Sequence, residues 1–170
     1  MLLGATILFS LHSCSYKKAK NYNSETNADQ DGMTFIKNGL EGGLTEIKAS
    51  GMAITNSNNP RVLMLAKMMI DDHTKAGDEL KKIKGDKDVI AKDTINTEHL
   101  QMIHALSDKK GPAFDKAYLQ MMVADHEKAL ALFAGATRVN SPEIKDFAAK
   151  TLPAIQMHLD SSKAILASLK

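Results

Sequence analysis

A short phrase rich in potential metal ligands occurs twice in this chain of 170 residues. Each copy places a methionine four residues before a histidine, Met69 before His73 and Met122 before His126. Positions i and i+4 share one face of a helix, so each copy presents a thioether beside an imidazole. Imidazole binds copper, zinc and iron, and thioether selects Cu(I). The copies are identical at six of nine positions and span residues 68–76 (MMIDDHTKA) and 121–129 (MMVADHEKA).

Five other polar residues are candidates to complete or support this site. Glu46 and His158 interrupt the apolar faces of two further stretches with helical periodicity. Asp72 and Asp125 directly precede the repeated histidines, so on a helix their side chains point about 100° away from them. We expect these aspartates to orient imidazole rings by hydrogen bonds, as carboxylates beside metal-bound histidines do. Tyr118, one turn before the second copy, is a candidate core residue or hydrogen-bond partner.

The spacing of apolar residues predicts an all-α protein in which four long helices carry these side chains. Asn59-Pro60 and Ser141-Pro142 each place an N-cap residue before a proline at the first helical position. A short crossover helix, capped by Thr97, is expected at about 98–107, with His99 and His104 exposed and without a role. The expected long helices span about 34–55, 60–84, 112–139 and 142–170.

The first helix carries a row of small residues beside its apolar stripe. Gly39, Gly43, Ser50 and Ala53 form this row, and Glu46 is the one large residue that interrupts it. Glycine destabilises a helix, so such a row indicates close approach of a neighbouring helix. We therefore expect Glu46 to point into a tight seam between helices.

Counting residues from the two turns predicts that the polar side chains lie at one level of a four-helix bundle. Glu46 lies about twelve residues before the first turn and His73 about fifteen after it. His126 lies about fourteen before the second turn and His158 about eighteen after it. A helix rises about 1.5 Å per residue, so these differences amount to a few ångströms. One glutamate and three histidines should therefore meet near mid-height.

Two interpretations of this convergence stay open on the sequence. The first is a copper or zinc site, because three imidazoles suit these metals and two nearby thioethers favour copper over a hard cation. The second is a buried polar layer whose members satisfy one another by hydrogen bonds and fix the register of the helices. The residues of the proposed metal site are Glu46, His73, His126 and His158, with Met69 and Met122 as soft neighbours.

Four blocks of the chain, taken together, resemble a bacterial family of domains of unknown function. Its members are labelled predicted outer-membrane or exported proteins and are grouped with the ferritin-like bundles. The resemblance covers about residues 33–168 and implies a ferritin-like four-helix bundle in the cell envelope, without a known activity. Ferritins use a glutamate from each of two helices and Glu-x-x-His from the others, and most of those carboxylates are missing here. The matching blocks are MIDDHTK (69–75), FDKAY (114–118), MVADH (122–126), and TLP (151–153) followed by His158.

The first residues predict export and a lipid anchor. Residues 1–13 contain no charged side chain and are too short to span a bilayer, which is typical of the apolar part of a signal peptide. Residues 11–14 (LHSC) resemble a bacterial lipobox, and Cys14 is the only cysteine of the chain. Lipidation of Cys14 would attach the protein to a membrane; the alternative is a secretory signal with an incidental cysteine. We expect a flexible tether at 14–32 and the bundle at 33–170.

Composition and motifs favour a binding protein over an enzyme. The formal net charge is +2, too close to neutral for a nucleic-acid partner, and the lysines are scattered. The chain has no nucleophile placed beside a base, no glycine-rich phosphate loop and no His-Glu-x-x-His motif. The sequence therefore predicts an envelope lipoprotein that binds a metal in a helical bundle, or else a structural or interaction module of the envelope.

Overall fold

The computed structural model describes residues 29–169, which form five helices. Helix α3 is short, and the other four are long. This architecture confirms the predicted all-α bundle with a short crossover helix between the second and third long helices. The helices are α1 (Gln30–Asn56), α2 (Pro60–Asp86), α3 (Thr97–Ser107), α4 (Gly111–Ala136) and α5 (Pro142–Ala167).

Helix starts are fixed by capping side chains, two of which the sequence predicts correctly. The Asn59 side chain accepts a hydrogen bond from the backbone of Arg61, and Ser141 Oγ accepts one from the backbone of Ile144. The crossover helix is capped by Asn96 rather than Thr97, because the Asn96 side chain accepts from the His99 backbone N–H. An amide oxygen caps a helix better than the threonine hydroxyl one residue later.

The first helix begins earlier than predicted. Helix α1 starts at Gln30 rather than near Thr34, and the Asp29 carboxylate caps it by accepting from the Gly32 N–H at 2.8 Å. The last residues of the expected tether are therefore helical. The predicted signal peptide, Cys14 and the start of the tether lie outside the described residues. Within residues 29–169, no helix combines the length and apolarity that crossing a membrane requires.

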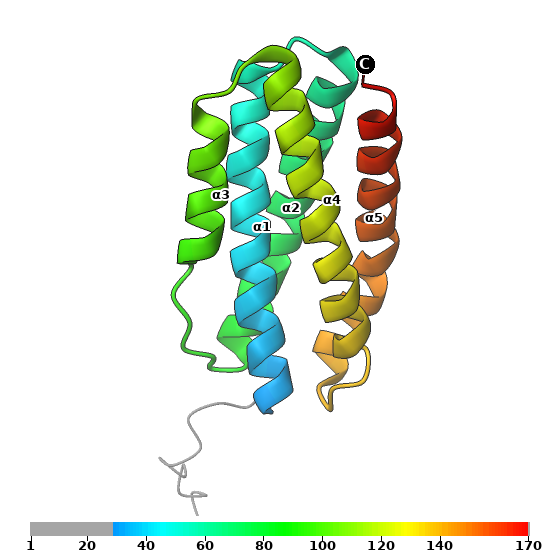
Figure 1. Ribbon diagram of the computed structural model, residues 1–170. Coiled ribbons are helices and arrows are strands. Elements are labelled where there is room, and N and C mark those ends of the chain that lie inside the picture. The colour runs from blue at the N-terminus through cyan, green and yellow to red at the C-terminus, as the bar shows by residue number, and fades with distance from the viewer. Residues whose placement is uncertain (1–28, 170) are drawn as a thin grey trace, which may run out of the picture.

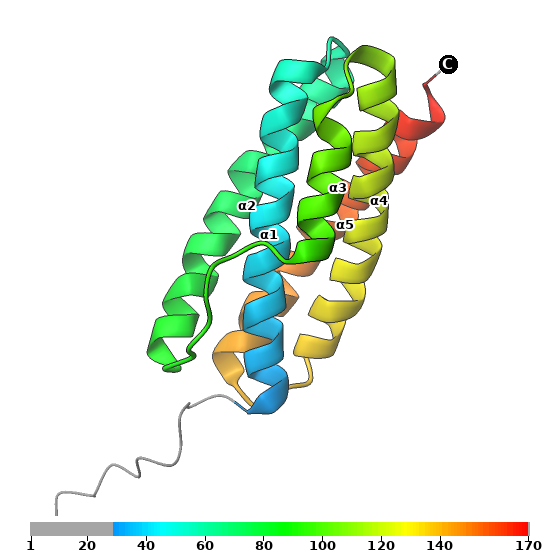
Figure 2. The ribbon, with the colours of Figure 1, turned by 60° about the vertical axis from the view of Figure 1, so that its left-hand side comes forward.

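The four long helices stand as the edges of a square prism, and every neighbouring pair is antiparallel. Helix α1 contacts α2 and α4, and α5 contacts the same two helices. Figure 1 shows the chain running up α1, down α2, down α4 and up α5. Helix α3 carries the chain back between α2 and α4 and packs outside the square, against α1 and α4 (Figure 2). The face of the bundle between α1 and α4 is thus covered by a fifth helix.

The bundle interior consists of two apolar clusters with polar residues between them. The upper cluster surrounds Phe114 and Tyr118, and the lower one surrounds the edge-to-face ring pair of Phe35 and Phe133, with ring centroids 4.9 Å apart. Both clusters draw residues from all four long helices, so each holds the whole bundle together at its own level. Met69 and Met122 are fully buried members of the upper cluster.

The row of small residues in α1 is tight at only one of its two glycines. A Cβ atom on Gly39 would lie 2.9 Å from the Cδ2 atom of Leu80, so α2 does approach closely there. A Cβ atom on Gly43 would meet nothing within 4 Å, because Gly43 lines a cavity. The predicted continuous seam is therefore wrong at Gly43, and the missing side chain leaves open space instead of contact.

Alanine substitutions at Gly39 and Gly51 of α1 test the close approach of Leu80 through their effects on the free energy of unfolding. We expect Gly51→Ala to raise the free energy of unfolding by about 1 kcal/mol, because Gly51 is exposed with open space around its Cβ position. Gly39→Ala should stabilise less, since the gain in helix propensity is offset by the displacement of Leu80. Urea unfolding of both variants checks this. Equal stabilisation by the two substitutions would contradict the tight contact.

Candidate metal centre

The polar layer between the two apolar clusters contains one residue from each long helix. Glu46 comes from α1, His73 from α2, His126 from α4 and His158 from α5. The three imidazole rings form a triangle whose centroids lie 5.2, 5.3 and 5.6 Å apart. Glu46, His126 and His158 are buried, and the His73 side chain is 14% exposed. The structure thus brings together the four residues that counting from the turns places at one level.

Glu46 is the anion of the layer. Its Oε2 atom lies 2.8 Å from His73 Nε2, and its Oε1 atom lies 3.2 Å from His126 Nδ1. Burial alone would raise the pKa of Glu46, but the charges of His73 and His126 outweigh it and lower the pKa to about 2. Burial likewise disfavours charge on His73, but the Glu46 carboxylate raises its pKa above the ordinary value. The raised pKa favours the imidazolium form of His73 beside the Glu46 carboxylate in the metal-free layer, and an ion that binds His73 must displace this proton.

The other two imidazoles present lone pairs to each other. His126 Nδ1 lies 2.9 Å from the backbone carbonyl of Met122, which can only accept, so Nδ1 carries the proton. His158 Nε2 lies 3.0 Å from the Asp72 carboxylate and donates to it for the same reason. Burial lowers the pKa of both rings, so both are neutral near pH 7. Their remaining nitrogens, His126 Nε2 and His158 Nδ1, are 3.3 Å apart, and both can only accept.

This donor set fits a small transition-metal ion. Two nitrogens bound to a tetrahedral ion at about 2.0–2.1 Å lie roughly 3.3–3.4 Å apart, which matches the separation of the two facing nitrogens. One nitrogen from each of the three histidines lies within 4.8 Å of the other two. His73 Nε2 is buried and has no aligned hydrogen bond, because its contact with Glu46 lacks hydrogen-bond geometry. A cation would satisfy the facing lone pairs of His126 Nε2 and His158 Nδ1, which no proton donor in the layer satisfies.

The two aspartates of the repeated phrase each face a histidine of a neighbouring helix. Asp72 bonds His158 of α5 rather than the adjacent His73, as its turn of about 100° requires. Asp125 is turned toward α3, where its Oδ1 atom lies 3.8 Å from His99 Nε2. Asp72 is thus positioned to orient an imidazole of the layer. Asp125, expected to do the same, makes no hydrogen bond to the three histidines and faces α3 instead.

Tyr118 lies in the upper apolar cluster, above the layer. Its hydroxyl is 2.8 Å from Ser50 Oγ, and both side chains are fully buried. Burial raises the pKa of Tyr118 far above its ordinary value, so the phenol stays neutral. The phenol therefore ties α4 to α1 through Ser50, one turn from Glu46.

The Tyr118→Phe variant tests whether Tyr118 stabilises the fold without contributing to metal binding. We expect Tyr118→Phe to lower the free energy of unfolding by about 1–3 kcal/mol, because the buried Ser50 hydroxyl loses its partner. The affinity for metal should stay unchanged, since Tyr118 makes no hydrogen bond to Glu46 or the histidines. Chemical denaturation and a metal titration measure the two effects. A loss of affinity without a loss of stability would contradict this role.

His99 is the residue whose placement the sequence predicts wrongly. Its side chain is 14% exposed, and its Nδ1 atom lies 2.8 and 2.9 Å from the two carboxylate oxygens of Glu41. His104 on the same helix is exposed, as predicted. Neither Glu41 nor the docking of α3 is visible in the sequence pattern. The only local signal is the Asn96 cap, which sets where α3 begins.

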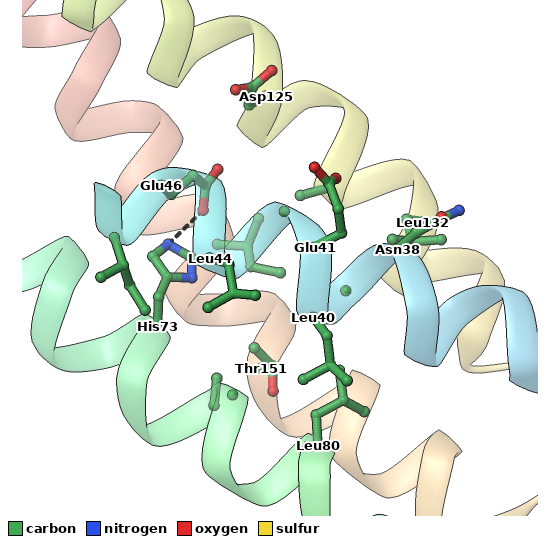
Figure 3. A pocket seen from close by; sticks show the side chains of 18 of the residues that line it. Asn38, Leu40, Glu41, Leu44, Glu46, His73, Leu80, Asp125, Leu132 and Thr151 are labelled. Atoms are coloured by element: carbon green, nitrogen blue, oxygen red, sulfur yellow. Dashed lines mark ion pairs between the residues drawn. The ribbon is translucent and has the colours of Figure 1, made fainter. Parts of the chain in front are cut away.

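Glu41, His99 and Asp125 form an outer cluster beside α3. A cavity of about 450 Å³ connects this outer cluster with the histidine layer. Glu46 and His73 line it on one side, and Glu41 and Asp125 on another (Figure 3). His99 also lines this cavity. Figure 3 also shows the ion pair of Glu46 and His73 at the cavity wall. Apolar side chains form much of the remaining wall, among them Leu40, Leu44, Leu132, Phe133 and Phe147.

Comparison with known proteins identifies related folds. No curated protein matches the chain. A solved DUF305 fragment from Deinococcus radiodurans has a TM-score of 0.75 at 16% identity, covering 84% of this chain and 99% of its own. CopM in the Cu(II)-bound form has a TM-score of 0.70 at 18% identity, covering 82% of this chain and 97% of its own. CopM in the Cu(I)-bound form has a TM-score of 0.65 at 18% identity, covering 78% of this chain and 93% of its own. At these identities, the similarity establishes a shared bundle fold.

The sequence itself matches a known family over most of its length. Residues 17–165 match the family described as a domain of unknown function, DUF4142. The match includes every helix except the last residues of α5, and all four members of the polar layer. This agrees with the resemblance to a family of domains of unknown function, and the chain belongs to the DUF4142 family.

Proposed function

We propose that this protein binds one copper or zinc ion through His73, His126 and His158, with Glu46 beside them as the counter-charge. The observation that carries the proposal is the pair of facing lone pairs on His126 Nε2 and His158 Nδ1, 3.3 Å apart in a buried layer. Acceptors that face each other without a proton between them repel, whereas a shared cation stabilises both.

The chemistry of the donors favours copper or zinc over a di-iron centre. Three imidazoles with one carboxylate suit copper and zinc, whereas di-iron bundles use several glutamates around two ions. Glu46 is the only carboxylate among the four residues of the layer. The copper-bound structures of CopM, which shares this fold, support the choice of copper. Met69 and Met122 lie one turn above the layer and would favour Cu(I) if their sulfurs reach it.

The surrounding residues prepare the site for an ion. The Met122 carbonyl and Asp72 each hold the proton of one imidazole on the nitrogen that faces away from the other ring. Such partners fix the tautomer and orientation of a metal-binding histidine. The apolar clusters cover the layer above and below, and the cavity lined by Glu46 and His73 reaches it from the side. A bound ion would supply Lewis acidity or, for copper, one-electron chemistry, and the site as built serves to hold the ion.

The direct test is metal titration of protein purified without a histidine tag and freed of metal with a chelator. We expect one equivalent of Cu or Zn to bind tightly. At a free concentration 100 times the dissociation constant, binding should add about 2.7 kcal/mol to the free energy of unfolding. For a chain of this size, this raises the melting temperature by roughly 5–10 °C. Absence of both binding and shift would overturn the proposal and favour a polar layer that fixes helix register.

We also propose that the protein works in the bacterial cell envelope, attached to a membrane through lipid on Cys14. The proposal rests on the apolar, uncharged residues 1–13 and on the lipobox-like residues 11–14. Palmitate labelling in the native host should mark the wild-type chain and not the Cys14→Ala variant. Equal labelling of the two, or none, would contradict the anchor and leave the metal site untouched.

A further inference from the structure

We infer that His99 and Asp125 form a second, outer site for a divalent cation, on the wall of the cavity that reaches the histidine layer. This inference rests on the proposed function, because it names where the ion is captured before it enters the layer. The outer site is built from α3 and α4, whereas the layer uses the four long helices. The two sites therefore share a cavity and no ligand.

Asp125 is a buried carboxylate without a hydrogen bond. Its side chain is 7% exposed, and in the described part of the chain neither of its oxygens accepts a hydrogen bond. The nearest side-chain nitrogens are His99 Nε2 at 3.8 Å and Lys128 Nζ at 4.0 Å, both too far for a hydrogen bond. A buried carboxylate is costly unless it is paired or binds a metal. Asp125 thus offers two free oxygens to a cation in the cavity.

His99 is oriented to present its free nitrogen to these oxygens. The Glu41 carboxylate accepts from His99 Nδ1–H at 2.8 Å, so Nε2 of the neutral ring keeps its lone pair. A carboxylate that holds the far nitrogen of an imidazole is the usual companion of a metal-bound histidine. Bonds of about 2.1 Å from nitrogen and from oxygen span up to roughly 4.2 Å, so an ion fits in the 3.8 Å gap.

The two copies of the repeated phrase differ at this point. The Asp72 carboxylate accepts a hydrogen bond of 3.0 Å from His158 Nε2–H, so this aspartate has a partner. Asp125 Oδ1 and His99 Nε2 are 3.8 Å apart, too far for a hydrogen bond but close enough for both to bind one cation. With only two protein ligands and the remaining positions open to water, the outer site should bind more weakly than the layer. Weak capture beside His73 and Glu46, which line the same cavity, suits delivery of the ion inward.

Zinc titration of the full chain tests the outer site separately from the layer. In the His158→Ala background, which lacks the inner site, we expect one weakly bound Zn²⁺ to remain. Adding Asp125→Asn should weaken that binding by about tenfold or more, and Glu41→Gln by about 10–100-fold. Glu98→Gln is the matched control, because Glu98 lines the same cavity and its side chain is 72% exposed. It removes the same charge and should leave the binding unchanged.

Uptake kinetics complete the test. In the otherwise wild-type chain, Asp125→Asn should slow the entry of Zn²⁺ into the layer while leaving the final affinity of the layer unchanged. The variant should fold, because an amide removes a buried unpaired charge, and a thermal melt of the metal-free protein verifies this. Zn²⁺ binding in the His158→Ala background that is absent, or equally strong with and without Asp125→Asn, would overturn the outer site. Equal binding by wild type and His158→Ala would instead overturn the proposed function.

Discussion

Replacing His158 by alanine should weaken the binding of copper or zinc by more than about 100-fold. Loss of a carboxylate or carbonyl that merely orients a metal-binding histidine costs about 10–100-fold, and loss of the ligand itself costs more. His158 supplies one of the two facing nitrogens and is nearly completely buried, so no neighbouring side chain replaces it. A competition titration against a chelator of known affinity measures the change.

Two further variants make this prediction sharper. Asp72→Asn keeps the shape of the side chain but weakens the hold on His158 Nε2–H, so it should cost about 10–100-fold in affinity. His104→Ala removes an exposed histidine outside the layer and should change nothing. If His158→Ala and His104→Ala lose affinity equally, the ion binds elsewhere. Circular dichroism of each variant shows whether the bundle is intact.

Replacing Glu46 by glutamine should destabilise the metal-free protein most at acidic pH. Removal of one partner from a buried ion pair costs about 3–5 kcal/mol. Near pH 5 we expect the free energy of unfolding to fall by about 3 kcal/mol, the lower end of this range, because His73 can release its proton when the carboxylate is gone. Near pH 8 the fall should be smaller. Urea unfolding in the presence of a chelator, repeated between pH 5 and pH 8, gives the difference at each pH.

The sign of this dependence follows from the pKa of His73. In the wild type this pKa is raised, so the pair stabilises the fold fully below pH 6.5 and loses its effect as the pH rises through the raised value. Glu46, with a pKa of about 2, stays ionised throughout this range. In the variant the carboxylate of Glu46 is gone and only the weaker effect of Asp72 opposes burial, so protonation of His73 becomes unfavourable in the fold as the pH falls.

An exposed ion pair provides the control for this pH series. Glu79 lies 2.5 Å from Lys150 at the surface, and this pair contains no histidine. Glu79→Gln should therefore give the same small change in the free energy of unfolding at every pH. A Glu46→Gln effect that is equally flat would show that His73 does not carry the proton in the folded protein.

The level at which the polar residues meet was predictable because it depends on local quantities. Helix rise and the position of two capped turns fix the height of each side chain, and Asn59 and Ser141 mark those turns clearly. The apolar faces then decide that His126 and His158 point inward. Neither step needs knowledge of which helix lies beside which.

The outer cluster was not predictable, because it depends on where α3 docks. The amphipathic pattern of a short helix says which face is apolar, but not against which corner of a bundle that face packs. The sequence therefore predicts His99 as exposed, and it gives no sign that Asp125 faces His99 rather than a histidine of the layer. Gly43 likewise predicted contact where the fold leaves a cavity, since a small residue permits close approach without requiring it.

The separation of the interior into two apolar clusters has a consequence for local opening of the bundle. Regions that share few apolar contacts unfold as partly independent cooperative units, which amide hydrogen exchange resolves. The layer of Glu46 and the three histidines lies between the upper and lower clusters. An ion bound there by the three histidines would cross-link α2, α4 and α5 at mid-height, with α1 held beside it by the charge of Glu46, so both ends would open and exchange together instead of fraying separately.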